Sequence, residues 1–288
     1  MRRDTKIYGP TPFPFAHFAR PPSWVYDARM FRWACRWKEA VAGLTQAGCG
    51  LLFPPRCASC EVDLAEDGER SLLCAECLAL LGPETWPGCR RCGGAVDAGE
   101  GQPAHCPLCK NVPLRFDAAV TLGSYHAGLR AVILRMKRPS HDGLSTAMGR
   151  LLAGRRRHEL ESIRADVVVP IPMFWTRRLG RGTNSPELLA GCLGSALNVP
   201  VRRRLLVRCR NTLPQAGLQP PQRFRNMRGA FRVRRGAGVE NARVLLVDDV
   251  LTTGATCSEA AKMLKQAGAS LVAVAVVARA QGTKGVGP

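Results

Sequence analysis

The chain has 288 residues, and 46% of them are hydrophobic. This is enough apolar material for the core of one large domain or two smaller ones, and it excludes wholesale disorder. The longest uninterrupted apolar stretch, Leu271–Ala278, has eight residues, far fewer than the roughly 20 that cross a bilayer. No apolar signal segment follows the basic N-terminus. The sequence therefore predicts a cytoplasmic protein with no membrane insertion.

Charge is distributed unevenly along the chain. The 42 Lys and Arg residues exceed the 22 Asp and Glu residues, and the net charge is +20. Residues 1–56 carry +6, residues 57–110 carry −5 and residues 111–288 carry +19, so the sign changes at a predicted domain boundary. A strongly basic C-terminal portion favours a partner rich in phosphate, either a nucleotide or nucleic acid. Only 7 of the 42 cations are Lys, however, so an arginine-rich genome is the alternative explanation.

Residues 1–50 are predicted to form an N-terminal extension that is partly disordered. They are rich in Pro and aromatic residues as far as Trp37 and show no clean period. A plausible helix over Phe31–Leu44 begins directly after Met30, so the sequence leaves open whether translation starts at Met1 or at Met30.

Eight of the thirteen cysteines form four C-x2-C pairs, and the pairs are regularly spaced. Thirteen residues separate the first pair from the second, and thirteen separate the third from the fourth, so the segment is a duplicated unit. Random placement of the cysteines would produce only about 0.6 such pairs. The pairs are Cys57/Cys60, Cys74/Cys77, Cys89/Cys92 and Cys106/Cys109.

This spacing predicts two structural zinc ions in a double zinc ribbon. Two residues between cysteines allow a tight turn to aim both sulfurs at one tetrahedral zinc about 2.3 Å away, and Gly93 and Gly94 suit such a turn. Disulfides are the alternative, but a reducing compartment argues against them. Because four cysteines would fill all four coordination positions of each zinc ion, neither site has an open position for catalytic water. Spacing alone does not decide whether the pairs combine in sequence (first with second, third with fourth) or interleave (first with third, second with fourth).

The C-terminal half alternates apolar strands with helical patterns, which predicts a parallel α/β sheet covered on both faces. Strands are expected at 116–122, 166–170, 205–207, 243–247 and 271–277. Helices are expected at 128–137, 146–161 and 255–267, and another should begin at Ser185 as N-cap with Pro186 in its first turn. Arg155–Arg157 are placed on the outer face of their helix.

The residues after the strand at 243–247 predict a ribose 5-phosphate site. Asp248 and Asp249 end the strand, and a Thr/Gly-rich turn then leads directly into a helix. Ligands of such sheets bind at the carboxyl ends of strands. Adjacent carboxylates can accept hydrogen bonds from the two ribose hydroxyls, and the turn and helix N-terminus suit a single phosphate. Neither a P-loop nor a dinucleotide glycine motif is present. The plainer alternative is that the acids merely cap the turn.

This stretch resembles the phosphoribosyl pyrophosphate (PRPP) signature of type I phosphoribosyltransferases. Together with the preceding cysteine pairs, it resembles the ComF/GntX family of competence-associated proteins from about Leu51 to Ala278. The resemblance implies a type I phosphoribosyltransferase-like fold: a parallel sheet flanked by helices, preceded by a small double zinc ribbon. The corresponding domains are residues 1–50 (extension), 51–112 (double zinc ribbon), 113–282 (phosphoribosyltransferase-like domain) and 283–288 (flexible tail).

The resemblance also implies roles for particular residues. Asp248 and Asp249 would hold the ribose of PRPP. The 5-phosphate would be held by the turn residues Thr252, Thr253, Gly254, Ala255 and Thr256. The pyrophosphate side would be formed by Pro172, Arg177, Arg178, Arg181 and Asn184, although Ser185 stands where the family usually has Gln and Thr183 replaces an aromatic residue. A polar, proline-rich segment containing Gln215, Arg223 and Asn226 resembles the mobile lid of this fold, and an inert surface loop is the alternative.

The implied activity is transfer of a phosphoribosyl group from PRPP, with Mg²⁺, to an acceptor that the sequence does not identify, with release of pyrophosphate. The implied context is competence and DNA uptake, or nucleotide salvage. A different function is a non-catalytic adaptor that binds single-stranded DNA during natural transformation and retains PRPP binding as a regulatory site. The +19 charge of residues 111–288 favours it, but the few aromatic residues among those cations do not. Retained catalysis and oligomeric state are not readable from the sequence.

Overall fold

The computed structural model describes residues 55–64, 72–82, 86–96, 106–138, 140–176, 184–215, 217–236 and 238–280. All of them belong to one compact unit, Pro55–Pro288. The predictions for residues 1–50 and for the tail at 283–288 lie outside the described residues, as do Arg177, Arg178 and Arg181. In the described part of the chain, no helix is long and apolar enough to cross a membrane.

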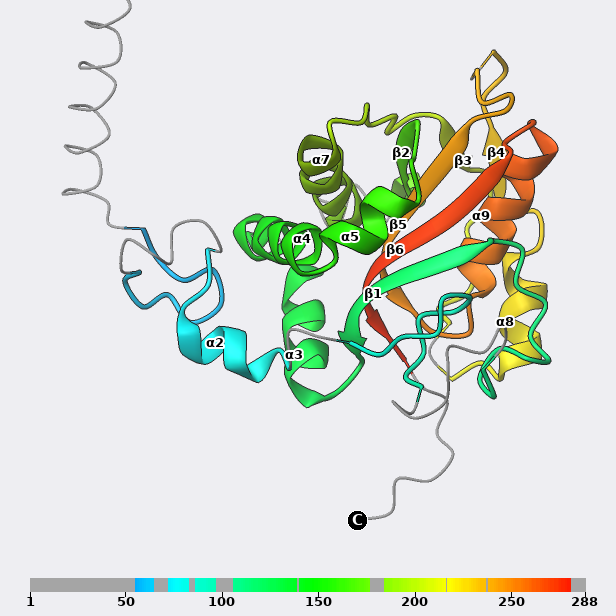
Figure 1. Cartoon of the computed structure of the whole chain (residues 1–288). Helices are drawn as coiled ribbons and strands as arrows, with labels where there is room; N and C mark the ends of the chain where they lie inside the picture. The colour runs from blue at the N-terminus through cyan, green and yellow to red at the C-terminus, as the bar shows by residue number, and fades with distance from the viewer. Residues whose placement is uncertain are drawn as a thin grey trace, which may run out of the picture. The chain divides into compact units, whose positions relative to one another are not determined.

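The centre of the unit is a four-stranded parallel sheet (Figure 1). β5 and β6 occupy its middle, and their continuous apolar runs, Val244–Val247 and Val272–Ala278, are fully buried, as such runs predict. The strands run in the order β1 (Ala118–Ser124), β6 (Leu271–Arg279), β5 (Arg243–Leu251) and β2 (Val167–Pro170). The predicted parallel sheet is therefore confirmed, and all four carboxyl ends lie at one edge.

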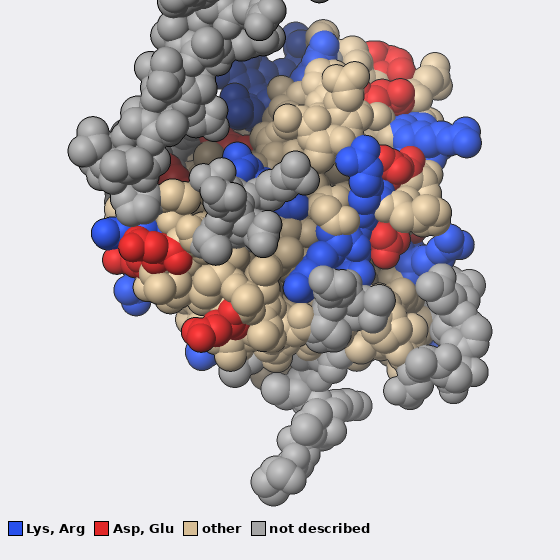
Figure 2. All heavy atoms as spheres, turned by 60° about the vertical axis from the view of Figure 1, so that its left-hand side comes forward, with Lys and Arg blue, Asp and Glu red and all other residues tan. Residues whose placement is uncertain are grey.

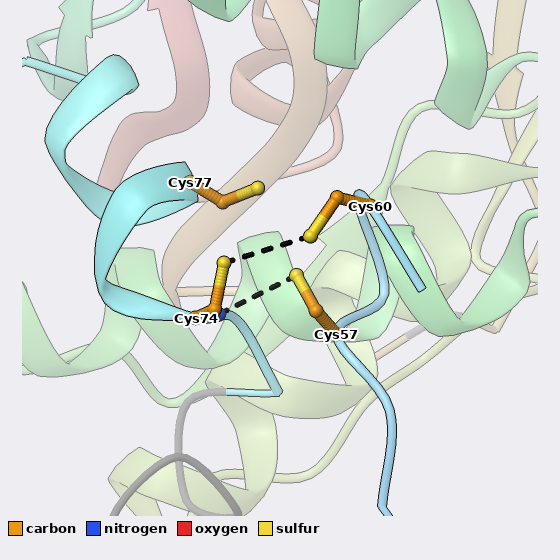
Figure 3. Close-up of side chains that lie close together, drawn as sticks. All are labelled: Cys57, Cys60, Cys74 and Cys77. Carbon is orange, nitrogen blue, oxygen red and sulfur yellow. Dashed lines mark hydrogen bonds between the residues drawn. The ribbon is translucent and has the colours of Figure 1, made fainter. Parts of the chain in front are cut away.

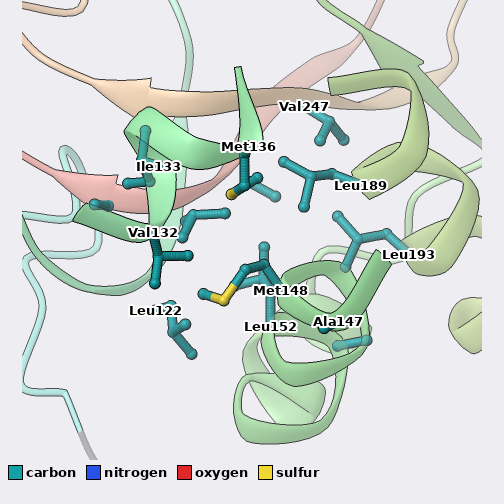
Figure 4. Packing of buried hydrophobic residues seen from close by; sticks show 14 of the residues in the cluster. Leu122, Val132, Ile133, Met136, Ala147, Met148, Leu152, Leu189, Leu193 and Val247 are labelled. Atoms are coloured by element: carbon teal, nitrogen blue, oxygen red, sulfur yellow. The ribbon is translucent and has the colours of Figure 1, made fainter. Parts of the chain in front are cut away.

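Alternate residues of these strands contribute to two separate cores. Leu245 and Val247 lie in a cluster with side chains of α3, α4 and α7 (Figure 4), whereas Val244 and Leu246 lie in a cluster with side chains of α9. This alternation is the period of a strand whose two faces are both covered. The helices of the first face are α3 (Ala127–Met136), α4 (Asp142–Arg155), α5 (Arg157–Ser162) and α7 (Ser185–Leu197), and the second face has α8 (Pro220–Met227) and α9 (Ala255–Gln266).

The helix expected at 146–161 is in fact two helices, and the break is at Arg156. The side chain of Arg156 is buried, not on the outer face as predicted. Its Nε donates to the Thr121 carbonyl oxygen at 2.9 Å and its Nη2 to that of Leu122 at 3.0 Å. Arg156 thus donates to two successive carbonyl groups of the edge strand β1, where the outward-facing backbone has no neighbouring strand. A helical pattern cannot reveal this, because the contact is made to a strand some 35 residues away.

The strand expected at 205–207 does not join the parallel sheet. It is β3 (Leu206–Arg208), and it pairs antiparallel with β4 (Phe231–Val233) in a separate two-stranded sheet, the β3–β4 hairpin, whose long connection contains α8. An isolated parallel bridge between Val168 and Val201 connects the approach to this hairpin with β2. β3 therefore runs toward the same edge of the sheet as β2, which brings its last residue, Arg208, to the carboxyl ends of the strands.

The cysteine segments are integrated into the two cores. Cys57 and Cys77 join the cluster of α3 and α4, and Cys77 belongs to the short helix α2 (Ala75–Leu80). The cysteines of the second segment join the cluster on the opposite face of the sheet: Cys89, Cys92, Cys106 and Cys109. Around the first segment, Arg135 Nη1 donates to Ser59 Oγ at 3.3 Å, and a Cβ at Gly128 would lie 2.1 Å from the Leu80 carbonyl oxygen. The close approach at Gly128 excludes any larger residue there.

Candidate functional sites

The eight paired cysteines form two tetrads, and each tetrad is built from consecutive pairs. One contains Cys57, Cys60, Cys74 and Cys77 (Figure 3), and the other contains Cys89, Cys92, Cys106 and Cys109. Within each tetrad all the sulfur atoms lie within 4.8 Å of one another. The pairing that spacing left open is thus sequential, and the interleaved alternative is wrong.

The sulfur spacing fits tetrahedral zinc. Zinc–sulfur bonds of about 2.3 Å place the sulfurs of a tetrahedral site about 3.8 Å apart. The Cys60–Cys74 distance is 3.6 Å, the Cys92–Cys106 distance is 3.5 Å and the Cys106–Cys109 distance is 3.8 Å. A disulfide would need sulfurs about 2 Å apart. Each tetrad could therefore hold one zinc ion.

One thiol in each tetrad has a lowered pKa. Burial raises the pKa of Cys57, but backbone N–H groups, led by that of Cys60, outweigh it and bring the value to about 6. Burial and backbone N–H groups, led by that of Cys92, act in the same way on Cys89, whose pKa is lowered to about 7. The thiolate is the form that binds zinc, so each tetrad has a ready first ligand.

The tetrads differ in exposure. All four cysteines of the second tetrad are buried, whereas in the first tetrad Cys60 is exposed and Cys74 is half-buried. We expect a chelator to remove one zinc ion per chain quickly, from the first tetrad, and the other slowly. Release of metal followed with a zinc-sensitive dye should show two phases of equal amplitude. A single phase would contradict this prediction.

A cavity of about 490 Å³ opens at the carboxyl ends of the strands. It brings together eight of the predicted site residues: Asp248, Asp249, Thr252, Thr256, Pro172, Asn184, Gln215 and Arg223. Thr253, Gly254, Ala255 and Asn226 do not line it. Three segments far apart in the sequence therefore meet at the edge where a ligand of a parallel sheet is expected.

β5 extends to Leu251, beyond the predicted end at Val247, so the two acids lie within its last four residues. They are neighbours of the lysine that caps the end of α3. Lys137 Nζ lies 3.1 Å from Asp249 Oδ2, and the backbone N–H of Asp249 donates to Asp248 Oδ1 at 2.9 Å. Desolvation, followed by the charge of Asp249, raises the pKa of Asp248 to about 7. At pH 7 the carboxyl of Asp248 is therefore about half protonated, and a cation arriving at the site would favour its full ionisation.

The turn after β5 is shaped for an anion at the start of α9. Gly254 has φ +84°, and a Cβ there would lie 2.6 Å from Leu114 Cδ2, so the position requires glycine. Directly after it, α9 begins at Ala255, and the N-terminus of a helix presents free N–H groups and the positive end of its dipole. Buried Arg279 from β6 donates to the carbonyl oxygens of Leu251 and Thr252 and holds the start of the turn.

The predicted lid segment contacts the turn directly. Gln215 Nε2 donates to Thr256 Oγ1 at 2.8 Å. Asn226 does not reach the cavity. Its side-chain amide instead bonds both backbone groups of Leu213, at 3.2 and 3.0 Å, and so fixes the segment that carries Gln215.

Two cations of the cavity were missing from the predicted site. Lys137 and Arg208 both line it, yet they lie at the end of α3 and on β3, far from the signature in sequence. For Lys137 the sequence offered a signal, because it matches the family's helix motif Y-x3-L-R-x6-K beginning at Tyr125. No sequence pattern indicated Arg208 as a site residue, because only the path of the β3–β4 hairpin brings it to the cavity.

The region containing this site matches known proteins. The family model of the phosphoribosyl transferase domain matches residues 209–286. Competence protein F of Haemophilus influenzae is 30% identical over 236 residues, which cover 79% of this chain and 98% of that protein. The chain belongs to the competence protein F family. The resemblance noted in the sequence is thus confirmed, and so is the phosphoribosyltransferase-like fold with two cysteine tetrads consistent with zinc ribbons.

Other relatives of this competence protein F family member match a smaller part of the chain. The DNA utilization protein YhgH of Escherichia coli K12 is 31% identical over 174 residues, 59% of this chain and 75% of that protein. Among solved structures, an allosteric regulatory enzyme of purine biosynthesis is 25% identical and covers 51% of this chain and 30% of that one, with a TM-score of 0.36.

Proposed function

We propose that the protein binds PRPP with Mg²⁺ and transfers its phosphoribosyl group to an acceptor, releasing pyrophosphate. One observation carries the proposal: the acid pair at the end of β5 faces a cavity and is followed by a left-handed glycine and the N-terminus of α9. Vicinal hydroxyls need paired acceptors, and a phosphate ester suits a helix N-terminus, so the site fits a ribose 5-phosphate. The cytoplasm, where PRPP is available, is the proposed location.

Different residues of the cavity would contact different parts of PRPP. Asp248 and Asp249 accept hydrogen bonds from the ribose hydroxyls, and the turn at 252–256 holds the 5-phosphate. Lys137, Arg208 and Arg223 line the cavity and can neutralise pyrophosphate, a role that the resemblance also gives to Arg177, Arg178 and Arg181. Mg²⁺ would be held by the acids together with phosphate oxygens and would stabilise charge on the leaving group.

In the transfer itself, the bond between ribose C1 and the pyrophosphate oxygen breaks, and pyrophosphate leaves with the electron pair. The acceptor's lone pair forms the new bond to C1, and the acceptor then loses its proton. Because Gln215 bonds Thr256 in the turn, the segment that carries it can close over bound PRPP and exclude water. The two proposed zinc ions are structural, since each tetrad supplies four protein ligands.

The decisive experiment incubates the purified protein with labelled PRPP, Mg²⁺ and a panel of purines, pyrimidines and amines. Release of pyrophosphate that depends on one acceptor would support the transferase. The names of the relatives connect them with competence and DNA utilization, so each reaction should also be run with single-stranded DNA.

A non-catalytic adaptor that binds single-stranded DNA and senses PRPP is the second candidate. The basic character of residues 111–288 favours it. PRPP binding without pyrophosphate release under any of these conditions, together with DNA binding altered by PRPP, would favour the adaptor over the enzyme.

The raised pKa of Asp248 predicts a pH dependence. Below about pH 7 the carboxyl is protonated in the free protein, and binding of Mg²⁺ and PRPP must release that proton. We therefore expect affinity to rise with pH until about 7 and then level off. Without ligand, pH acts on folding in the opposite direction. Between about pH 4 and 7 the folded state holds a proton on Asp248 that the unfolded state has lost, so the free energy of unfolding falls as pH rises through this range. Calorimetry in buffers of different ionisation enthalpy measures the proton release, and a pH-independent affinity between 5.5 and 8 would contradict the prediction.

A further inference from the structure

A second hollow in the structure is lined chiefly by arginine. It has a volume of about 680 Å³, and five arginines line it: Arg202, Arg203, Arg204, Arg234 and Arg235. All five are exposed. Among the described lining residues Glu187 is the one acid, and none is aromatic. The lining therefore has a net formal charge of +4.

The β3–β4 hairpin explains why these arginines meet. Arg202–Arg204 precede β3, and Arg234 and Arg235 follow β4. The antiparallel register pairs Leu206 with Val233 at this end of the hairpin and Arg208 with Phe231 at the other end. Since Arg208 lines the PRPP cavity, the arginine hollow lies at the opposite end of the same hairpin, and it is a separate site.

Four of the five arginines in the hollow have no acidic partner among the described residues. In the part of the chain that the structure describes, no carboxylate lies within ion-pair distance of Arg203, Arg204, Arg234 or Arg235. Clustered guanidinium groups repel one another and create a positive potential that concentrates anions. Lys and Arg side chains gather in patches on the surface (Figure 2), and the arginines of the hollow combine such charge with a concave shape.

We propose that this hollow binds a linear chain of phosphate groups. Guanidinium groups match phosphate oxygens in paired hydrogen bonds, and five arginines from two segments can contact successive phosphates. Because the described lining contains no aromatic ring on which a base could stack, recognition is of the phosphates alone. The ligand is therefore the backbone of a nucleic acid, bound without base preference, or a free polyphosphate. The site does not depend on PRPP binding.

The test compares two triple variants of the full chain that lose equal charge. The hollow variant carries Arg203→Gln, Arg234→Gln and Arg235→Gln. The control carries Lys110→Gln, Arg115→Gln and Arg150→Gln, which are exposed cations outside the described ion pairs and cavities. Fluorescence anisotropy would measure binding of oligo(dT), oligo(dA) and inorganic polyphosphate at several salt concentrations.

We expect the hollow variant to lose at least about tenfold in affinity at 0.1 M salt, and its salt slope to fall by about 2, since each single-strand phosphate contact contributes roughly 0.7. The control should retain the parent affinity within about threefold, and oligo(dT) and oligo(dA) should behave alike.

Loss of oligonucleotide binding alone identifies nucleic acid as the ligand, and loss of polyphosphate binding alone identifies free phosphate chains. Equal losses in both variants, or a parent that binds neither probe at low salt, would overturn the proposal. PRPP binding measured by calorimetry should be unchanged in both variants, so failure of the PRPP site would be seen separately.

Discussion

Replacing both Asp248 and Asp249 with Asn is expected to weaken PRPP binding at least a hundredfold. The amides keep the size of the carboxylates but remove two negative charges beside the proposed Mg²⁺, and they donate as well as accept. Each charge-assisted hydrogen bond that is lost should cost roughly 1.5–3 kcal/mol, so the pair should cost about 3–6 kcal/mol, which corresponds to the stated loss of affinity. Calorimetry with PRPP and Mg²⁺ measures it.

The matched control for this variant removes two acids elsewhere. Glu161 and Glu240 are exposed, and changing both to Gln should leave PRPP affinity within about twofold. Thermal stability without ligand should hold or rise in the double Asn variant, because two adjacent like charges no longer repel. If that variant bound PRPP as tightly as the parent, the acids would be structural caps of the turn and the proposed transferase would be wrong.

Changing Cys92 to Ser is expected to remove one of two zinc ions per chain and to destabilise the whole unit. Cys92 is fully buried, and its tetrad shares a core cluster with Phe116, Leu246 and Val274. Structural zinc contributes about 10–16 kcal/mol to small domains, which is comparable with the total stability of a typical domain. Elemental analysis should give about one zinc per chain, and thermal denaturation should show a melting temperature lowered by 10 °C or more, since each kcal/mol shifts it by roughly 2–4 °C.

Two further substitutions provide the comparison. Cys60→Ser should also remove one zinc ion, but with a smaller loss of stability, because Cys60 is exposed in the first tetrad. Cys209→Ser should change neither quantity, since Cys209 is exposed and lies outside both tetrads. A parent protein that contained less than one zinc ion per chain, when pure and reduced, would refute the metal assignment.

Features with a local cause were predictable from the sequence alone. The C-x2-C spacing, the apolar runs of β5 and β6, and the strand–turn–helix around Asp248 and Gly254 each depend on backbone geometry over a few residues. Their residue types report that geometry directly: glycine where φ is positive, and unbroken apolar runs where a strand is covered on both faces. The parallel sheet, the two cysteine sites and the acid pair at a strand end follow from these local signals.

Features that depend on which segments meet were decided only by the tertiary structure. Arg156 lies within a helical pattern, yet it is buried, and its guanidinium donates to two carbonyl oxygens of the edge strand β1. Lys137 and Arg208 reach the acid pair because α3 follows β1 and the β3–β4 hairpin lies outside the parallel sheet. The sequential pairing of the cysteines was likewise undecided, since both pairings satisfy the same spacing. Spacing constrains neighbours along the chain, whereas strand order and register decide which distant side chains share a site.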